Sequence, residues 1–415
     1  MTRRQVVVTG LGSVTPLAGT WAATWSAMLA GRSGVGPWPF FDASGYPAAI
    51  CGAVAVEDVD PRGLPSRELA RLGRPARMGV RAADEALAAA GLPAVDFDPG
   101  RGVFFGHSVG RPTVERLHEL AQHGVVPQVS PREALVQEPN VGLNLMARRM
   151  GAGGPVVGVS TACAASGHAI GEAMRAIEEG DVDVALAGGT DSLTSWIDLL
   201  GFSLLGALTT SWNHDPQGAS RPFSGDRDGF VIGEGAVALV LESLEHARRR
   251  GASVLAHLDG YASSLNAYRV TDSPPDGSGA YECMTGALDD ATWEPQSVDL
   301  VVAHGTSTPG NDAAETRAVR RTLGHHADEV VVAAPKGSVG HLTAASAALG
   351  VALAVQAIQD GTVPPTLNLT EAGPGCELDH AIARPRPGRY ARALVNAFAF
   401  GGTNACIAVS RGGRP

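Results

Sequence analysis

The feature that most constrains the fold is an alternation of two kinds of segment along the whole chain. Short apolar runs, many rich in valine, recur at residues 6–9, 102–105, 156–159, 182–187, 298–303, 330–333, 394–397 and 406–409. Alanine-rich stretches of helical composition lie between them, at residues 80–90, 166–179, 281–291 and 344–359. Strands that alternate with helices in this way are typical of α/β proteins. We therefore predict an α/β fold in which these runs are buried strands.

Composition argues against several other classes of protein. With 44% hydrophobic and 18% charged residues over 415 positions, the chain can bury a large core and is not disordered. Its 32 basic and 42 acidic side chains give a net charge of −10 without a long basic run, which argues against nucleic acid as a partner. Neither a run of about 20 apolar residues nor a secretion signal is present, so we expect a cytoplasmic protein without a membrane span.

Cys163 is the first candidate for chemistry. The chain has five cysteines with no CxxC pair, so we expect neither a zinc site nor a disulfide framework. Cys163 lies between the apolar run 156–159 and the helical stretch 166–179. A thiol at a helix N-terminus meets the positive end of the helix dipole and unpaired N–H groups, which favour the thiolate. A buried structural cysteine is the alternative, and its position alone leaves both open.

Two histidines stand at similar junctions. His304 follows the run 298–303, and His341 ends a glycine-containing turn that begins at Lys336. Polar groups directly after parallel strands lie where α/β folds place ligands. A single histidine is more often structural, but two histidines and one cysteine at three strand–turn–helix junctions favour a shared site.

The two halves of the chain resemble each other weakly. In each half an apolar run, a turn and the start of a small-residue helix follow one another, with Cys163 in the first and His341 178 positions later. We interpret this as a pseudo-duplicated α/β unit, with residues 1–250 as one half and 251–415 as the other. Near the C-terminus, the turn at Gly401 and Gly402 is either an ordinary hairpin or a source of backbone N–H groups for an oxyanion.

Five strings, in this order, resemble the β-ketoacyl-acyl carrier protein synthases. They are Thr-Ala-Cys (161–163), Ser-Arg-Pro-Phe with Asp-Arg-Asp-Gly-Phe-Val-Ile-Gly-Glu-Gly (220–235), His-Gly-Thr-Ser-Thr-Pro (304–309), Lys-Gly-Ser-Val-Gly-His (336–341) and Phe-Gly-Gly-Thr-Asn (400–404). The resemblance covers essentially the whole chain and is strongest to elongating type II fatty acid enzymes and their polyketide relatives. It implies a thiolase-like fold with two pseudo-equivalent halves in a five-layered α-β-α-β-α architecture, and a homodimer or a heterodimer with a related subunit.

The resemblance also implies a reaction, a decarboxylative Claisen condensation by an acyltransferase. Cys163 would take an acyl chain as a thioester from the phosphopantetheine arm of an acyl carrier protein. His304 and His341 would promote decarboxylation of malonyl-acyl carrier protein by hydrogen-bonding the developing enolate. The carbanion would then attack the thioester and give a 3-oxoacyl chain. No metal and no tightly bound cofactor is implied.

Further residues take implied roles from the same family pattern. The N–H groups of Cys163 and Phe400 would form an oxyanion hole, and Phe400 would also act as a gate. Lys336 would position the site electrostatically, and Glu315 would hold the network of Lys336 and His341. The implied pantetheine-binding residues are Thr306, Thr308, Gly401 and Gly402, and the acyl-pocket candidates are Val109, Ala134, Glu138, Asp198 and Phe202.

The chain departs from the family pattern near the implied acyl pocket. Residues 132–140 include charges where relatives carry aromatic and apolar side chains, and Asp198 stands where small apolar residues are usual. Burying an unpaired carboxylate is costly, so these groups pair, face water or meet a polar acyl group. We hypothesise a polar or unusual acyl substrate in a specialised pathway. An interfacial ion-pair network around Arg132 and Glu133 is the alternative.

Other functions on the same fold remain open. A non-condensing partner subunit, which sets chain length, usually lacks the nucleophile that Cys163 provides here. A cysteine-dependent acyltransferase needs no decarboxylation, whereas both histidines are present. A thiolase would need a second cysteine near the C-terminal glycine motif, and Cys406 lies past it. Docking of an acidic carrier protein would need a basic patch, and the best cluster, unless it is a solvated loop, is Arg67, Arg71, Arg74 and Arg77.

Overall fold

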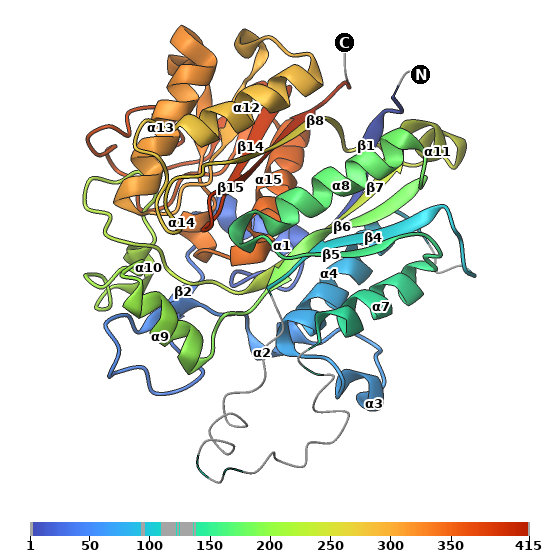
Figure 1. Ribbon diagram of the computed structural model, residues 1–415, viewed down its shortest axis with the longest axis horizontal. Helices are drawn as coiled ribbons and strands as arrows, with labels where there is room; N and C mark the ends of the chain where they lie inside the picture. Colours follow the sequence, from blue (N-terminus) through green and yellow to red (C-terminus); the bar gives the residue numbers. More distant parts are fainter. Residues whose placement is uncertain are drawn as a thin grey trace.

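The five strands of the first half lie next to one another in one sheet. The computed structural model describes residues 3–92, 96–108, 122, 124, 136 and 138–413 (Figure 1). The order of these strands is β1 (Val6–Val14), β7 (Gly235–Ser243), β6 (Val184–Asp191), β4 (Arg101–Gly106) and β5 (Val156–Val159). β7 is antiparallel to both β1 and β6, whereas β6, β4 and β5 run parallel.

The second half repeats this order and these directions. Its strands are β8 (Ala256–Leu265), β15 (Thr403–Ser410), β14 (Arg392–Phe398), β9 (Leu300–Val302) and β10 (Val331–Ala333). β15 is antiparallel to β8 and β14, and β14, β9 and β10 run parallel. The short β12 (Asp379–His380) adds to β10, and pairing of β1 with β8 makes the sheet continuous over 11 strands. The pseudo-duplication expected from the sequence is therefore confirmed.

Helices form three layers around the two strand groups (Figure 1). The layer between the groups consists of α8 (Ala165–Glu179) and α15 (Ser346–Asp360), which contact strands of both. α4 (Arg74–Ala89) and α7 (Pro139–Met150) pack on the outer side of the first group. α12 (Ser278–Ala291) packs on the second group and against α13 (Pro309–Leu323). This arrangement is the expected α-β-α-β-α architecture.

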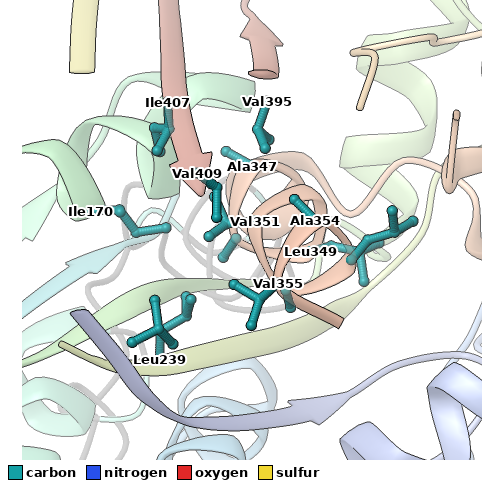
Figure 2. Close-up of a cluster of buried hydrophobic side chains, with 14 of the residues drawn as sticks. Ile170, Leu239, Ala347, Leu349, Val351, Ala354, Val355, Val395, Ile407 and Val409 are labelled. Carbon is teal, nitrogen blue, oxygen red and sulfur yellow. The ribbon is translucent and has the colours of Figure 1, made fainter. Parts of the chain in front are cut away.

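The central helices are nearly enclosed by apolar side chains. Ile170 of α8, Val351 of α15, Leu239 of β7, and Val395 and Ile407 of the second group belong to one buried cluster (Figure 2). Small residues in α15 let it approach the sheet closely, because a Cβ at Gly350 would lie 2.7 Å from a side-chain carbon of Val395. This packing holds α8 and α15 in place. The turns directly before their N-termini, η1 and η4, contribute to the site described below.

Shorter elements complete the described chain. The additional α-helices are α1 (Trp21–Leu29), α2 (Val56–Val59), α3 (Ser66–Leu69), α9 (Trp196–Leu204), α10 (Pro216–Ala219), α11 (Leu244–Arg249) and α14 (Lys336–Val339). The 3-10 turns are η1 (Ala162–Ala164), η2 (Pro295–Ser297), η3 (Gly324–Asp328) and η4 (Thr343–Ala345). The small two-stranded sheets pair β2 (Val35–Pro37) with β3 (Ile50–Gly52), and β11 (Thr362–Val363) with β13 (Arg386–Pro387). None of the helices in the described ranges is long and apolar enough to cross a membrane.

The structure corrects three expectations about individual elements. β5 is not buried as predicted, since it lies at the end of the described sheet and Val156 is 46% exposed. β7 and β8 were not predicted, because β7 is rich in alanine and leucine and β8 carries polar residues such as Asp259. The predicted loop over residues 34–46 contains β2.

The two halves match in a register different from the one inferred from the sequence. α8 and α15 are each preceded by a 3-10 turn whose first residue has a positive φ, 49° at Ala162 and 46° at Thr343. This places Ala344, rather than His341, opposite Cys163. The two halves therefore repeat the same backbone path. Cys163 and His341, which suggested the repeat in the sequence, do not occupy equivalent positions in it.

Candidate active site

A cavity of about 450 Å³ collects residues from both halves of the chain. Cys163 reaches it from η1, His304 from the segment after β9, and His341 from the segment between α14 and η4. Thr306, Thr308, Phe202 and Phe400 also line it. The structure therefore brings together three residues that the sequence places at separate strand–turn–helix junctions.

Cys163 lies directly against His341. The Sγ atom of Cys163 is 3.1 Å from Nε2 of His341. Burial raises the pKa of the Cys163 thiol to about 11, although the charge of Lys336 and the N–H groups of Phe400 and Cys163 lower it. These N–H groups favour the thiolate, but desolvation of the charged form has the larger effect on the pKa of the resting thiol.

Hydrogen bonds determine which nitrogen of each histidine carries the proton. Nδ1 of His341 accepts a hydrogen bond from the N–H of Thr343 at 3.2 Å. Nδ1 of His304 lies 3.3 Å from Nζ of Lys336, and a lysine ammonium can only donate. In both neutral rings the proton is therefore on Nε2. Burial, with the charge of Lys336 adding to it, holds the pKa of both histidines well below the ordinary value, so neutral rings are expected near pH 7.

Lys336 is the only lysine in the sequence. It is 4% exposed, and its Nζ donates to the carbonyl oxygen of His304. Burial lowers its pKa to about 8, and the charge of Glu315 opposes that shift. All other basic side chains except histidine are arginines, which do not lose their proton in proteins. The one side-chain amine of the chain, whose lowered pKa lets its charge change near neutral pH, therefore lies against the His304 ring.

Glu315 holds the backbone on which His304 stands. Its Oε1 accepts from the N–H of His304 and its Oε2 from the N–H of Gly305, both at 2.8 Å, and Asn396 donates to Oε1 at 3.0 Å. The prediction that Glu315 holds the network of Lys336 and His341 is corrected in this respect. Glu315 binds backbone groups of the His304 turn and acts on Lys336 through its charge.

The turn after His304 depends on a glycine and on an aspartate that the sequence analysis did not single out. Gly305 has φ +41°, and a Cβ there would lie 2.9 Å from Cβ of Ala334. Asp312 accepts from the N–H of Thr306 at 3.0 Å and from that of Phe223 at 2.8 Å. Asp312 and Glu315 are three residues apart on α13, a spacing that places both on one helix face and that could have identified Asp312.

Phe400 occupies the turn between β14 and β15. Its ring lies 6.5 Å from that of Phe230, which in turn lies 5.4 Å from the His341 ring. The predicted pantetheine-binding residues Thr306 and Thr308 line the cavity, with their hydroxyl oxygens 2.8 Å apart.

Gly401 and Gly402 are not among the lining residues, and pantetheine binding by them stays a prediction. They give the turn its positive φ angles of 87° and 81°.

The acyl-pocket candidates separate into three groups. Phe202 lines the cavity. Glu138 caps α7 by accepting from Asn140, and Asp198 forms a capping box with Ser195 at the start of α9, so neither is among the lining residues. The helix N-termini use these carboxylates as hydrogen-bond acceptors, which corrects the prediction. Val109 and Ala134 lie outside the described residues, as do Arg132 and Glu133.

The sequence analysis missed several polar lining residues, of which three lie near Cys163 and His341. Ser108, Asp191 and Thr343 all border the cavity. Asp191 is the last residue of β6 and only 2% exposed. Its place at the end of a parallel strand is the same signal that identified His304, and it could have been found in that way.

The basic cluster proposed for docking is partly used within the fold. Arg74 forms an ion pair with the buried Glu234, and Arg77 pairs with Asp60 at 3.1 Å. Arg67 remains exposed on α3. Among the residues with described positions, no group of three or more His, Cys, Asp and Glu side chains is placed to hold a metal ion.

Comparison with known proteins identifies the family. Residues 3–247 match the model of the beta-ketoacyl synthase N-terminal domain, and residues 255–370 match that of the C-terminal domain. A relative named 3-oxoacyl-[acyl-carrier-protein] synthase 2, from Coxiella burnetii, is 37% identical over 99% of this chain and 99% of its own.

Solved structures agree with this assignment. A type II polyketide synthase acyl-carrier protein in complex with its ketosynthase bound to the hexaketide matches with a TM-score of 0.90 at 31% identity, over 98% of this chain and 99% of that one. The ishigamide ketosynthase/chain length factor matches with a TM-score of 0.88 at 32% identity, over the same shares of the two chains. With the thiolase-like architecture and a cysteine and two histidines around one cavity, the chain belongs to the β-ketoacyl synthase family of condensing acyltransferases.

Proposed function

We propose that this protein condenses a Cys163-bound acyl chain with malonyl-acyl carrier protein to give a 3-oxoacyl-acyl carrier protein. The observation that carries the proposal is the protonation pattern of the two histidines. Both Nδ1 atoms face hydrogen-bond donors, so both Nε2 atoms are donors themselves, beside a cysteine in one cavity. Two neutral N–H donors suit the stabilisation of a developing enolate oxygen.

The first step is transfer of the acyl group to Cys163. The sulfur attacks the thioester carbonyl, a new S–C bond forms, and the bond to the pantetheine sulfur breaks, with the thiol proton passing to the leaving thiolate. The N–H groups of Phe400 and Cys163, which lower the pKa of the Cys163 thiol, would donate to the oxyanion of the tetrahedral intermediate. Because the resting thiol has a pKa of about 11, these donors and the charge of Lys336 matter for attack near neutral pH.

The second step uses the histidines. The C–C bond to the malonyl carboxylate breaks, CO₂ leaves, and the electron pair moves onto the thioester oxygen as an enolate. Nε2–H of His304 and of His341 would donate to that oxygen. The enolate carbon then attacks the acyl carbonyl, the new C–C bond forms, and Cys163 leaves as a thiolate that regains a proton.

Lys336 and Glu315 are positioning residues in this proposal. Lys336 keeps Nδ1 of His304 occupied, and therefore keeps the proton of that ring on Nε2. Glu315 fixes the His304 backbone. Phe400 borders the cavity next to Phe230 and would gate the entry of the pantetheine arm, which Thr306 and Thr308 would line.

The proposal extends to partners and organisation. The substrates arrive on the phosphopantetheine arm of an acyl carrier protein, and a cytoplasmic location would keep Cys163 reduced. β5, with its partly exposed valines at the end of the described sheet, suits pairing with a second identical or related subunit. The halves 1–250 and 251–415 would act as one unit, because the cavity needs residues of both.

The test is intact-protein mass spectrometry with a panel of acyl-carrier proteins, on wild type and Cys163→Ala. Wild type should gain the acyl mass, the variant should not, and malonyl-acyl carrier protein should then discharge the adduct as a 3-oxoacyl product. Loading without discharge would instead indicate an acyltransferase. A wild type that stays unmodified with every chain would contradict the proposal and favour a non-condensing partner subunit.

A further inference from the structure

A buried carboxylate borders the cavity and is held by four hydrogen bonds. Oδ2 of Asp191 accepts from the hydroxyl of Ser108 at 2.7 Å, from the N–H of Ala344 at 3.1 Å and from the hydroxyl of Thr343. Oδ1 accepts from the N–H of Ser192 at 3.0 Å. Two of these donors are backbone groups that cannot reverse their direction, so the ionised form of Asp191 suits this environment, although burial raises its pKa.

The cluster of Ser108, Asp191 and Thr343, called here the acceptor cluster, presents only lone pairs to a ligand. Each hydroxyl has a single proton, and both protons are donated to Asp191. Oδ1 of Asp191 receives one hydrogen bond from the described residues, and a carboxylate oxygen can accept a second. All three side chains border the same cavity as Cys163.

The acceptor cluster lies close to the reacting atoms. Thr343 donates its N–H to Nδ1 of His341, and Nε2 of that ring is 3.1 Å from the sulfur of Cys163. The charge of Asp191 also raises the pKa of the Cys163 thiol, which makes the nucleophile harder to ionise. A carboxylate at this place thus opposes thiolate formation, and a compensating interaction with the substrate would account for it.

The same cavity also has an aromatic part, which differs in polarity from the acceptor cluster. Phe202, Phe230 and Phe400 border the cavity, and the Phe230 ring lies edge to face with each of the other two. A plain alkyl chain would suit the rings but would leave the lone pairs of the acceptor cluster unpaired, and a keto group would bring an acceptor against acceptors. A hydroxyl or ammonium group would supply the missing proton.

We propose that the acyl chain accepted by Cys163 carries a hydrogen-bond donor, a hydroxyl or an amino group, that pairs with Ser108, Asp191 and Thr343. This rests on the proposed condensing function and names the class of acyl group within it. It also replaces the sequence-based reason for a polar substrate, since Glu138 and Asp198 cap helices and the polar groups at the cavity are different ones.

The test compares acyl-pantetheine thioesters of equal length. Hexanoyl, 3-hydroxyhexanoyl, 3-aminohexanoyl and 3-oxohexanoyl thioesters, with the hydroxyl also moved to carbons 4 and 5, are offered to the full-length protein, and Cys163 acylation is timed by intact mass spectrometry. At least one hydroxy or amino chain should react roughly tenfold faster than hexanoyl, the size expected for one hydrogen bond to a charged group. The oxo chain should react no faster than hexanoyl.

Variants test whether the acceptor cluster causes the preference for hydroxy or amino chains. Thr343→Val and Ser108→Ala, which nearly keep side-chain shape, should each reduce the preference severalfold, and Asp191→Asn should abolish it. Glu242→Gln is the matched control, because Glu242 is also buried and hydrogen-bonded but binds Thr9, His246 and Arg250 on the far end of β7. It should leave the preference unchanged even where it lowers stability.

Three outcomes would contradict a proposal, and they are distinguishable. Hexanoyl or oxo chains reacting as fast as every hydroxy and amino chain would overturn this inference while leaving the condensing function intact. No acylation by any thioester, with acyl-carrier proteins also inactive, would instead overturn the proposed function. A preference for donors that survives in Asp191→Asn and Thr343→Val would place the recognition elsewhere and likewise overturn the inference.

Discussion

The two halves of the molecule build the same turn and use it differently. In both, a 3-10 turn whose first residue has a positive φ leads into a central helix of 15 residues. The second residue of the turn is Cys163 in the first half and Ala344 in the second. Cys163 borders the cavity, whereas Ala344 is fully buried and gives its N–H to Asp191. The backbone repeat thus sets the position of a residue, and the side chains packed around that position decide whether it borders the cavity.

The strongest way to break this comparison is to move the thiol from one turn to the other. Cys163→Ala should lower acyl-adduct formation by at least about a thousandfold, as expected for loss of a nucleophile. The double variant Cys163→Ala/Ala344→Cys should stay equally inactive, because position 344 is enclosed on all sides. Intact mass spectrometry checks both, with thermal unfolding as the control for folding. An acyl adduct on residue 344 would show that the two turns are functionally equivalent.

The next effect separates the two steps of the reaction. His304→Ala and His341→Ala should each slow the discharge of a preformed acyl-enzyme by malonyl-acyl carrier protein about a hundred- to a thousandfold, the cost of losing one oxyanion donor. Acylation of Cys163 should fall much less in His304→Ala, since His341 is the ring in contact with the sulfur. Rapid-quench mass spectrometry measures the two rates separately. Equal losses in both steps would contradict separate roles.

A smaller effect concerns the single lysine, which allows its charge to be observed directly. In protein labelled with ¹³C-lysine, NMR should show the Lys336 signal titrating near pH 8, where the side chain loses its proton as pH rises through its lowered pKa. Glu315→Gln should shift the midpoint to lower pH, because the charge of Glu315 favours the ammonium form. A midpoint at the ordinary lysine value, about 10.4, would show that Lys336 is not desolvated as described.

The smallest expected effect is on stability. Ala162→Gly should leave the free energy of unfolding within about 0.5 kcal/mol of wild type, because relief of the positive φ offsets the greater freedom of glycine in the unfolded chain. Ala164→Gly, two residues later at φ −93°, should lose about 1 kcal/mol, since no such relief is available. Urea denaturation measures the free energy of unfolding of both variants. If Ala162→Gly loses as much stability as Ala164→Gly, the positive φ of Ala162 does not strain the native state.

Much of the site was accessible from the sequence because its residues stand next to secondary-structure boundaries. Cys163, His304 and His341 each follow an apolar run at a helix start, and the structure places all three at one cavity. The predicted role of Glu315 was partly wrong for a physical reason. A glutamate in the second turn of α13 can reach the backbone of the His304 turn, and Glu315 makes this contact instead of one to His341.

The polar residues of the cavity show the limit of sequence reasoning. The strand end at Asp191 could have marked that residue as a candidate. Nothing in the sequence shows that Asp191, Ser108 and Thr343, which are far apart in the chain, share hydrogen bonds. Conversely, Asp198 and Glu138 looked like pocket residues by position, but each is closer to a helix N-terminus whose free N–H groups need an acceptor.

The sequence by itself determined the alternation of strands and helices, the family, and the cysteine and two histidines that meet at the cavity, because these depend on local pattern. Only the tertiary structure decided which histidine nitrogen holds its proton, how far the Cys163 thiol is desolvated, and which polar groups border the cavity. These properties depend on hydrogen bonds and burial between residues brought together from both halves, such as Lys336 with His304 and Asp191 with Thr343. Local pattern carries no information on such distances, and packing of the two halves supplies it.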